Sequence, residues 1–571
     1  MTNNGTLLGN TQLTVGANQV NQSAAGKLFS GGDLWLESKG LDVVGQVVAL
    51  GNLTLKLTNA FTSKTALAAG KTLAISSNGA IDNRSVMQGQ AVNLTAGGQL
   101  TNNGQITTGT GASTLSGSTV ALNGAGTIQG GGDINIASRG NMTVDGFTGT
   151  RGSLTLSAPG SIINTALLYA ANNMALYANS ITNQRGDILA GNSLWMQKDA
   201  AGNANSQVVN TSGNIETTRG DITIKTAQLL NQRDGLQATS VKEDLSQAYP
   251  WLGEAVADVP LTFFEAREYG TYAIDNVIHA GSCSSHWCFE YHIMQEVYAL
   301  KERGVQKALA VNKETLTVDS QSAASRISSG KNININAASL ENIASNILAN
   351  GNISLAGNTF NNNSFQTSVK TDYLLYEYKG PLAGSVVTGS VSNSGGGGGL
   401  QDKTNAPVKN SISLTLVGHE IREEIGQIYR AVIQAGGNVT ANFSNNISNT
   451  NTTANAGGVS NTISAPSLNT LSNKAIGGGA QKQSLTNTAA VAVNSPEWND
   501  QLQGALQQIN GGGALDGNGA SNTALTNIST TQKGNANLGK LDSLANAGVT
   551  TAALNNATGG ATGQYQGKTV D

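Results

Sequence analysis

The sequence has 571 residues, of which 12% are charged and 5% are aromatic, with 71 glycines, 7 prolines and 2 cysteines. The formal net charge of −3 gives no overall positive field that would attract nucleic acid, and no apolar run is long enough to cross a membrane as a helix. Abundant glycine with few charges and few prolines favours a repetitive all-β fold with many turns.

The N-terminal residues Met1–Asn4 have neither the positive segment nor the apolar segment of a secretory signal peptide. An exported protein whose sequence lacks its export signal is a piece of a longer chain. We therefore interpret this sequence as a portion of a longer exported protein.

Residues 1–236 repeat a unit of about 20 residues. Each unit has a glycine-bearing turn followed by an apolar–x–apolar triplet, as in GGDINI (131–136) and RGSLTL (151–156). Alternate residues of a strand point to the same side, and only the stacking of successive units can bury them. The repeat predicts an elongated parallel β-helix, and it fits neither a propeller nor a leucine-rich repeat. The first apolar positions of the units are Leu34, Leu53, Leu73, Ile134, Leu154, Met174, Leu194 and Ile222.

Asparagine recurs with the same period, which predicts a hydrogen-bonded ladder of side-chain amides at one corner of the coil. The step from Leu194 to Ile222 is longer than the others, so residues 198–205 are predicted to form a loop at a corner. The expected ladder positions are Asn83, Asn103, Asn123, Asn164, Asn183, Asn210 and Asn231.

Residues 237–325 break the repeat and hold a dense group of aromatic residues, ten of the chain's 26 falling within 249–298. Ser240 followed by Glu243 fits a capping box, and the apolar residues between Ile293 and Leu300 have helical spacing. We therefore expect a small, separately packed insert that contains α-helix.

Both cysteines, Cys283 and Cys288, lie in this insert, with His286 between them and His292 just beyond. A disulfide that pins a short loop is the favoured interpretation for an exported chain. A metal site and two free thiols are the alternatives, but the spacing is not that of a standard zinc pair. We expect no metal and no cofactor.

The β-helix rhythm resumes in 326–363, where Ile333 and Ile353 are again 20 residues apart. Residues 364–443 are interpreted as a second insert with a returning coil: Ile421, Ile425 and Ile428 suit an amphipathic helix but also suit strands that re-enter the coil. Residues 444–571 are rich in Gly, Asn, Thr and Ala, which predicts a low-complexity or weakly structured region.

The inserts are the strongest candidates for a binding surface. Most of their aromatic residues should form a local core, and any that are exposed would mark contacts with a protein. Residues 249–298 carry seven acidic residues against one basic residue, Arg267, which favours a basic protein surface as the partner. The candidate receptor-binding residues are Tyr249, Trp251, Phe263, Phe264, His286, Trp287, Phe289, Tyr373, Tyr376 and Tyr378.

No catalytic motif is complete. The run that starts at His419 reads HEIRE and lacks the second histidine of a zinc protease, and no GxSxG motif is present. A polysaccharide-degrading β-helix would need acids and bases grouped on neighbouring coils. The acids that follow turn glycines and the arginines that follow corner asparagines are spread along the rod, which favours turn chemistry over catalysis. These residues are Asp33, Asp133, Asp187, Asp221, Arg84, Arg185 and Arg233.

The repeats resemble those of filamentous haemagglutinin-type exoproteins, on the strength of Ile181–Gly186, Leu230–Arg233 and GDITI (220–224). Coils, then a cysteine-bearing block, then a Gly/Asn-rich region resemble the middle of a contact-dependent growth-inhibition effector. The resemblance implies that 1–236 is a distal stalk and that 237–440 recognises an outer-membrane β-barrel protein of a target bacterium.

The same resemblance implies a secreted filament on the bacterial surface, exported through an outer-membrane transporter, with its toxin outside this sequence. We expect no enzyme, since no catalytic motif is complete, and no nucleic-acid-binding protein, since the chain has no overall positive field. The alternatives are a haemagglutinin-like adhesin for host cells or glycans and, less favoured, the polysaccharide-degrading β-helix.

Overall fold

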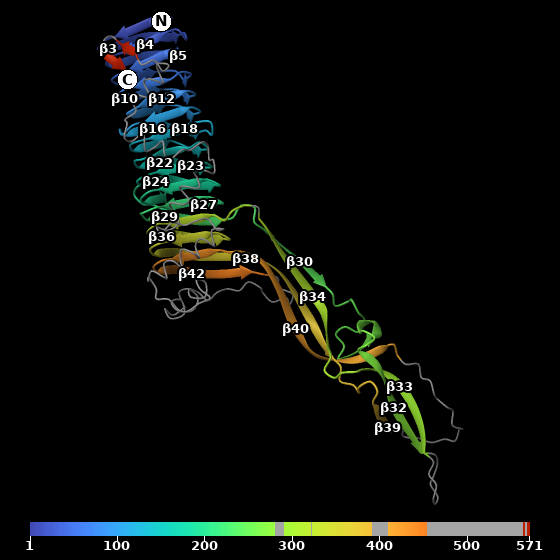
Figure 1. Cartoon of the computed structure of the whole chain (residues 1–571). Helices are drawn as coiled ribbons and strands as arrows, with labels where there is room; N and C mark the ends of the chain where they lie inside the picture. The colour runs from blue at the N-terminus through green and yellow to red at the C-terminus, as the bar shows by residue number, and fades with distance from the viewer. Residues whose placement is uncertain (280–289, 321, 391–408, 454–562, 566–567, 571) are drawn as a thin grey trace, which may run out of the picture.

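The computed structural model describes residues 1–279, 290–320, 322–390, 409–453, 563–565 and 568–570. Most of them form a stack of coils whose parallel strands pair with the coils before and after, so the predicted parallel β-helix is confirmed. Figure 1 shows the strands as rungs of a long stack with the N-terminus at one end. We call the described residues of 1–233, 325–363 and 431–453 the rod.

One face of the rod is a 14-stranded parallel sheet to which each coil gives one short strand. Its strands are β2 (Thr6–Gly9), β4 (Lys27–Ser30), β6 (Gln46–Ala49), β9 (Leu67–Ala69), β12 (Val86–Gly89), β15 (Gln105–Thr108), β18 (Thr127–Gly130), β21 (Thr148–Thr150), β23 (Leu167–Ala170), β25 (Asp187–Ala190), β28 (Asn214–Thr217), β35 (Arg326–Ser329), β37 (Asn346–Ala349) and β41 (Val432–Ala435).

The rest of each coil belongs to a second, larger sheet. Its rod strands are β1 (Thr2–Asn3), β3 (Gln12–Gln22), β5 (Asp33–Val43), β7 (Leu53–Leu57), β8 (Phe61–Ser63), β10 (Thr72–Ser77), β11 (Ile81–Asn83), β13 (Ala91–Ala96), β14 (Leu100–Asn102), β16 (Ser113–Gly117), β17 (Val120–Leu122), β19 (Ile134–Ser138), β20 (Met142–Val144), β22 (Leu154–Asn164), β24 (Met174–Gln184), β26 (Leu194–Gln197), β27 (Asn205–Thr211), β29 (Ile222–Gln232), β36 (Ile333–Ile343), β38 (Ile353–Glu377) and β42 (Val439–Thr452).

The predicted apolar positions stack in register and form the core of the rod. Ile134 pairs with Leu154, and Leu154 pairs with Met174; all three side chains are buried. The register continues across the first insert, where Ile222 pairs with Ile333 in the next coil. The core is therefore a continuous apolar column that no single unit could form.

A ladder of asparagines, buried except for the terminal Asn449, follows one corner, and two of the predicted positions lie one residue outside it. Asn83 donates to Asn102 Oδ1 at 2.9 Å, so Asn102 rather than Asn103 is the ladder position. Leu122 and Val144 occupy the same position in the next two coils, so Asn123 also lies one residue outside the ladder. The ladder then runs from Asn164 through Asn183, Asn210, Asn231, Asn342 and Asn362 to Asn449, with donor–acceptor distances of 2.7–2.9 Å.

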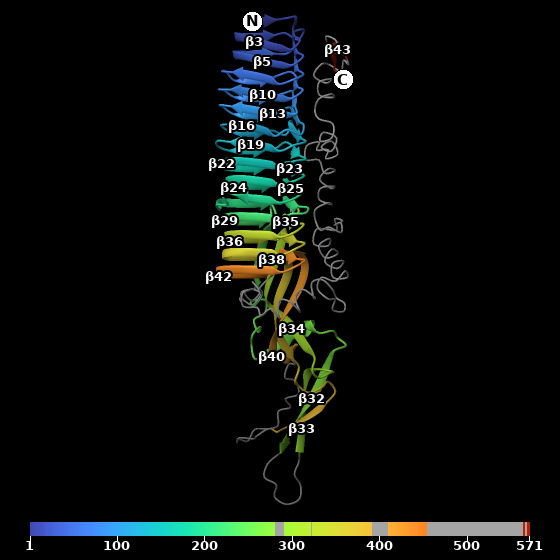
Figure 2. The ribbon, with the colours of Figure 1, turned by 90° about the vertical axis from the view of Figure 1, so that its left-hand side faces the viewer.

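A second body, the arm, projects from the end of the rod opposite the N-terminus (Figures 1 and 2). We define the arm as the described residues of 234–324 and 364–430. Four of its strand segments pair antiparallel in the order β30, β34, β38, β40, and β31 pairs with the far part of β40. The arm elements are β30 (Gln237–Asp244), β31 (Val256–Pro260), the 3-10 turn η1 (Leu261–Phe263), β32 (Tyr269–His279), β33 (Glu290–Leu300), β34 (Gln306–Asp319), β39 (Val386–Ser390) and β40 (Ser411–Tyr429).

Rod and arm share a strand. β38 begins as a rung beside β36 and β42 and continues, without a break, into the arm between β34 and β40. After β40 returns, β41 and β42 rejoin the coil. The sequence GGNVTANF (436–443) thus supplies part of a further rung.

The predicted helices are wrong. Residues from Ser240 belong to β30, residues 293–300 belong to β33, and Ile421 to Ile428 belong to β40. Ser240 does not cap a helix: its hydroxyl donates to the Glu314 carboxylate on the neighbouring strand β34. The insert is therefore β-structured, with η1 as its one helical turn among the described residues.

No helix in the described part of the chain is both long and apolar enough to span a membrane. Near the C-terminus, β43 (Gly563–Tyr565) and β44 (Lys568–Val570) pair with each other as a short antiparallel hairpin.

Candidate functional site: the arm and its junction with the rod

The far part of the arm has an apolar core of its own, which we call the head core. Tyr376 lies at its centre and is fully buried. Its hydroxyl accepts from the Gly253 amide at 2.9 Å and donates to the Glu254 carbonyl oxygen at 3.0 Å, which ties β38 to the loop before β31. The buried members of the head core are Ala257, Val259, Phe264, Ala299, Leu300, Tyr376, Tyr378, Ile412 and Leu414.

Three partly exposed aromatic residues cap this core. Tyr249 and Trp251 stack with ring centroids 5.2 Å apart, and both rings meet Phe263 edge-on. Trp251 also packs edge-on against Tyr376 at 6.0 Å. The aromatic density in the sequence is thus used mainly to build a small core, while Tyr249, Trp251 and Phe263 retain some exposed surface.

The outermost part of the arm is a three-stranded sheet in the order β33, β32, β39, which we call the tip sheet. Met294, Val386 and Val387 of this sheet are 47%, 61% and 40% exposed. His292 Nδ1 lies 2.8 Å from the Asp275 carboxylate on the neighbouring strand. The sequence from 269 to 300 contains no Lys or Arg, so neither of these bases offsets the acidic side chains of β32 and β33.

The strands that lead from the rod to the head carry charged pairs across neighbours. Lys313 faces Glu243, and His419 Nε2 lies 2.9 Å from Asp372 Oδ1. The Arg422 guanidinium lies over the Tyr373 ring at 4.8 Å, so Tyr373 is a stacking platform on the arm surface. Nearer the head, the hydroxyl of Ser413 donates to Asp258 at 2.6 Å and lowers the pKa of that carboxyl.

The structure brings some of the predicted binding residues together and buries others. Tyr249, Trp251 and Phe263 form one group, while Phe264, Tyr376 and Tyr378 lie inside the head core. Tyr373 stands apart on the strand that leads to the head. The remaining predictions, His286, Trp287, Phe289 and the pair Cys283 and Cys288, lie outside the described residues.

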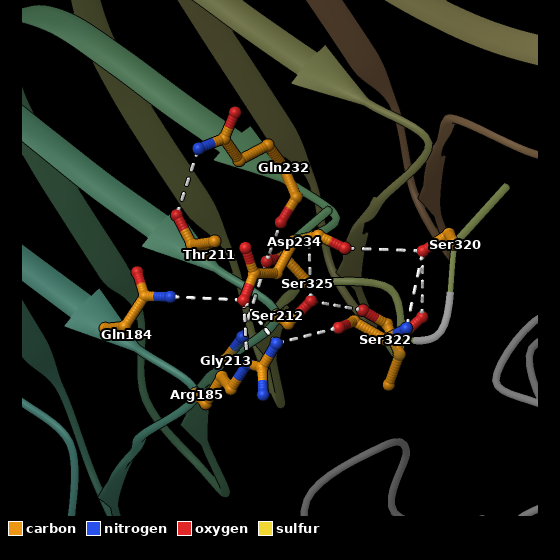
Figure 3. Close-up of polar contacts among 11 residues, drawn as sticks. Gln184, Arg185, Thr211, Ser212, Gly213, Gln232, Asp234, Ser320, Ser322 and Ser325 are labelled. Atoms are coloured by element: carbon orange, nitrogen blue, oxygen red, sulfur yellow. Dashed lines mark hydrogen bonds and ion pairs between the residues drawn. The ribbon is translucent and has the colours of Figure 1, made fainter. Parts of the chain in front are cut away.

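A polar cluster closes the junction where the chain leaves the rod (Figure 3). Asp234, the first residue of the arm, accepts from Arg185 Nε at 2.7 Å and from Gln184 Nε2 at 3.3 Å. Its own amide donates to the Ser212 hydroxyl oxygen at 2.8 Å. Arg185 also donates to the Ser322 hydroxyl at 3.1 Å, so one guanidinium joins the outgoing and returning ends of the first insert.

Arg185 and Ser212 occupy equivalent corners of adjacent coils and have left-handed backbones, with φ of 52° and 46°. Residues other than glycine adopt this conformation at a cost, and they keep it where the surroundings hold them. At Ser212 the hydroxyl also donates to the Ala323 carbonyl oxygen at 2.6 Å. The side chains of Arg185 and Ser212 at these corners thus contact both the outgoing and the returning end of the first insert.

The other side of the junction is apolar. Leu316, Val318, Ala344 and Tyr429 are buried together, where β34 and β40 meet the rod. The guanidinium of Arg233 lies over the Tyr429 ring at 5.1 Å and donates to the Ser322 carbonyl oxygen at 2.7 Å. Arg233 therefore contacts both the returning end of the first insert and the returning end of the second.

A buried ion pair bridges the two coils that flank the first insert. Glu216 of β28 is 1% exposed and pairs with Arg326 of β35, which is the first strand after the arm. Burial raises the pKa of Glu216 to about 8, and Asp187 nearby also raises it, although Arg326 opposes the shift. The pair joins two coils that are far apart in sequence.

Three of the four turn acids, Asp33, Asp133 and Asp221, accept from a backbone amide of the next coil, whereas Asp187 accepts from the Asn214 side chain. Asp33 Oδ1 accepts from the Asn52 amide and Asp133 Oδ1 from the Ser153 amide, each at 2.8 Å. They cap the next coil instead of their own turn, which corrects the detail of the predicted turn chemistry. Among the described residues no group of three or more His, Cys, Asp or Glu side chains could hold a metal ion.

Sequence reasoning missed most of the junction. It noted Arg185 and Arg233 only as residues that follow corner asparagines, and it did not single out Ser212, Asp234 or Tyr429. Their contacts with the ends of the inserts span 22 to 196 positions, from Ser212–Asp234 to Arg233–Tyr429, and no local pattern marks such distances. The one available clue was position, because Arg233 and Asp234 stand where the repeat stops.

Comparison with known proteins gives three informative relatives. The chain is 42% identical over 501 residues to the tRNA nuclease CdiA of Escherichia coli O6:K15:H31, 87% of this chain and 15% of that protein. It is 43% identical over 523 residues to the 16S rRNA endonuclease CdiA of Enterobacter cloacae subsp. cloacae, again 87% and 15%. It is 33% identical over 485 residues to the deoxyribonuclease CdiA of Dickeya dadantii, 82% and 14%.

No family model and no solved structure matches the chain. The chain spans about one seventh of the length of the relatives it matches, and the match extends over most of its own length. The β-helical rod agrees with the stalk implied by haemagglutinin-type repeats. The chain is therefore a homologue of CdiA proteins, and it corresponds to a stalk-bearing segment of those much longer chains.

Proposed function

We propose that this segment is the stalk and receptor-binding portion of a contact-dependent growth-inhibition protein. The rod holds the arm away from the producing cell, and the head and tip sheet recognise an outer-membrane protein of a target bacterium. The segment works as a display and binding module without catalysis, at the cell surface, after export through an outer-membrane transporter.

The observation that carries the proposal is the closure of the rod beneath the arm. Asn231 bonds directly to Asn342, and Ile222 pairs with Ile333, so the coils stack as if the first insert were absent. An insert that the rod does not need for its own packing can serve to present a surface.

The exposed apolar surface supports the same proposal. Large exposed apolar side chains are more frequent on the described arm than on the longer described rod, and such side chains mark protein contacts. The arm residues of this kind are Val241, Val256, Met294, Val386, Val387, Val417, Ile421 and Ile425, against Met1, Leu7, Trp35, Val44 and Ile163 on the rod.

The relatives' names support a role apart from the toxin. They name three different targets, tRNA, 16S rRNA and DNA, yet the matched segment remains 33–43% identical. A segment that stays similar while the named target changes is not expected to choose that target. In this proposal the nuclease activities belong to other parts of those proteins.

An arm-deletion variant of the full chain tests the proposal. The Ser320 hydroxyl lies 3.3 Å from the Asp234 carbonyl oxygen, and Phe365 pairs with Tyr429. Short turns can therefore replace residues 236–318 and 367–427 while the rod stays intact. A matched control shortens the corner loop at 199–204, which interrupts a single coil.

Binding is measured on intact target bacteria, on vesicles that contain their outer-membrane proteins, and on protein-free lipopolysaccharide vesicles. We expect the full chain and the loop control to bind the first two, and the arm-deletion variant to bind neither. Retained binding by the arm-deletion variant would contradict the proposal. Equal binding of the full chain to protein-free vesicles would instead favour the glycan-binding adhesin.

We also propose that Cys283 and Cys288 form a disulfide, which rests on their spacing and on export. Thiol titration of the unfolded chain tests it. We expect no reactive thiol before reduction and two afterwards, and two thiols before reduction would contradict the pairing.

A further inference from the structure

We propose that the junction cluster fixes the direction in which the arm leaves the rod, so that the head is presented at a set angle and not on a flexible tether. The cluster consists of Arg185, Ser212, Arg233, Asp234 and Tyr429. The value of a set angle rests on the proposed function, but the rigidity itself is a property of the junction.

The first argument is that three separate chain passages meet at the cluster. The outgoing chain is held through Asp234, the return of the first insert through Ser322, and the return of the second through Tyr429. A joint held at one passage can pivot about it, whereas a joint held at three separate passages cannot pivot without breaking contacts.

The second argument concerns what surrounds the ion pair. Arg185 and Asp234 are 63% and 27% exposed, and an exposed pair alone contributes little. Here the pair lies at a strained left-handed corner and is flanked by the half-buried contact of Arg233 with Tyr429. The apolar group of Leu316, Val318 and Ala344 fills the opposite side. The apolar group therefore holds the arm against the rod, and the polar contacts determine the orientation of the arm.

The third argument is a comparison within the chain. Arg84 is 64% exposed and pairs with Asp82 at 2.6 Å. It directly follows the ladder residue Asn83, whereas Arg185 lies two residues after Asn183. The Arg84 pair lies within one coil, and only at the junction do the described contacts of such a corner arginine reach a second body. Arg84 and Asp82 provide a matched control.

The test measures distances between spin labels on noncanonical residues at Asn172 of the rod and Glu302 of the arm, in the full chain. Both positions are exposed. We expect a narrow distance distribution in the parent and in Arg84→Ala. In Arg185→Ala/Arg233→Ala the distribution should widen at least about twofold, and Arg185→Lys should widen it less than Arg185→Ala.

A broad distribution in the parent would overturn the proposal, as would an unchanged width in Arg185→Ala/Arg233→Ala. If the double variant loses amide protection in the arm, Asp234→Asn is used instead, because it weakens the ion pair and keeps the shape of the side chain. An unchanged width of the distance distribution in a folded Asp234→Asn variant would likewise contradict the proposal that the junction cluster fixes the direction of the arm. The measurement needs no receptor, so its failure is separate from failure of the cell-binding assay.

Discussion

The side-chain amide of Asn231 donates to Oδ1 of Asn342 at 2.8 Å, although 111 positions separate the two residues. The same amide nitrogen donates to the Asn346 carbonyl oxygen at 3.2 Å. Both asparagines are fully buried, so neither could exchange this partner for water. The ladder thus joins the coils on either side of the first insert as closely as coils that follow each other directly.

Replacing Asn231 with alanine should loosen the rod at the base of the arm. The change removes two donated bonds and leaves the Asn210 amide without its acceptor at this rung. We expect a loss of about 1–3 kcal/mol in local opening free energy, the usual cost of an unsatisfied buried polar group. Hydrogen exchange of β29 and β36 measures it. Asn18→Ala, at an exposed position, should change little, and equal effects of the two variants would contradict the ladder's role.

Tyr376→Phe should destabilise the head and spare the rod. The ring would still fill the head core, but the two bonds to Gly253 and Glu254 would be lost, at about 1–3 kcal/mol. Hydrogen exchange in β31 and in the adjoining part of β40 should accelerate, while exchange in β22 and β24 should not. Tyr373→Phe is the control, since its ring can still stack under Arg422. Uniform acceleration along the whole chain would refute a separate head core.

The stability of the coils around Glu216 should fall as pH rises. Burial raises the pKa of this carboxyl from 4.5 to about 8, so the folded coil binds a proton that the unfolded chain releases. The stability that protonated Glu216 contributes to the folded coils is fully present below pH 4.5 and is lost as pH rises through 8. The free energy of unfolding changes over this range by at most about 1.4 kcal/mol per pH unit. Hydrogen exchange of β28 and β35 between pH 5 and 9, corrected for intrinsic rates, measures it. Glu216→Gln should flatten the dependence, and an equal slope in that variant would exclude Glu216 as the source.

Glycine at the two left-handed corners should have different effects. Ser212 and Ala344 both have φ of 46°, so glycine relieves the same backbone strain at each. Ser212→Gly also loses the hydroxyl bonds to Asp234 and Ala323. We expect Ser212→Gly to be less stable than Ala344→Gly by about 1–3 kcal/mol, measured by local hydrogen exchange at the junction. The reverse order would show that the hydroxyl contributes no net stability.

The rod could be predicted because its information is local and repeated. A 20-residue period places Leu154 under Met174 whatever lies elsewhere in the chain. The ladder was predicted with a one-residue error at Asn103, since two adjacent asparagines, Asn102 and Asn103, satisfy the same period, and only the strand register decides which one points inward.

The arm could not be predicted in the same way. Ile421 and Ile425 are four residues apart, a spacing that fits one face of a helix and equally one face of a strand, because four is an even number. What decides between the two is pairing with β38, whose partner residues lie about 50 to 60 positions away. The contacts at the junction depend on the same long-range pairing, so the sequence marked Arg185 but not its partner Asp234.

The 25-residue strand β38 has a mechanical consequence. If a target cell that is bound to the head pulls on it, the force is transmitted to the rod along the axis of this strand. In the rung, β38 is hydrogen-bonded to β36 on one side and β42 on the other, over ten and eleven paired positions. The load would therefore act on those bonds together as shear and would not peel them apart one at a time. β38 is therefore placed to anchor the arm in the rod, with the force shared among all of its hydrogen bonds to β36 and β42.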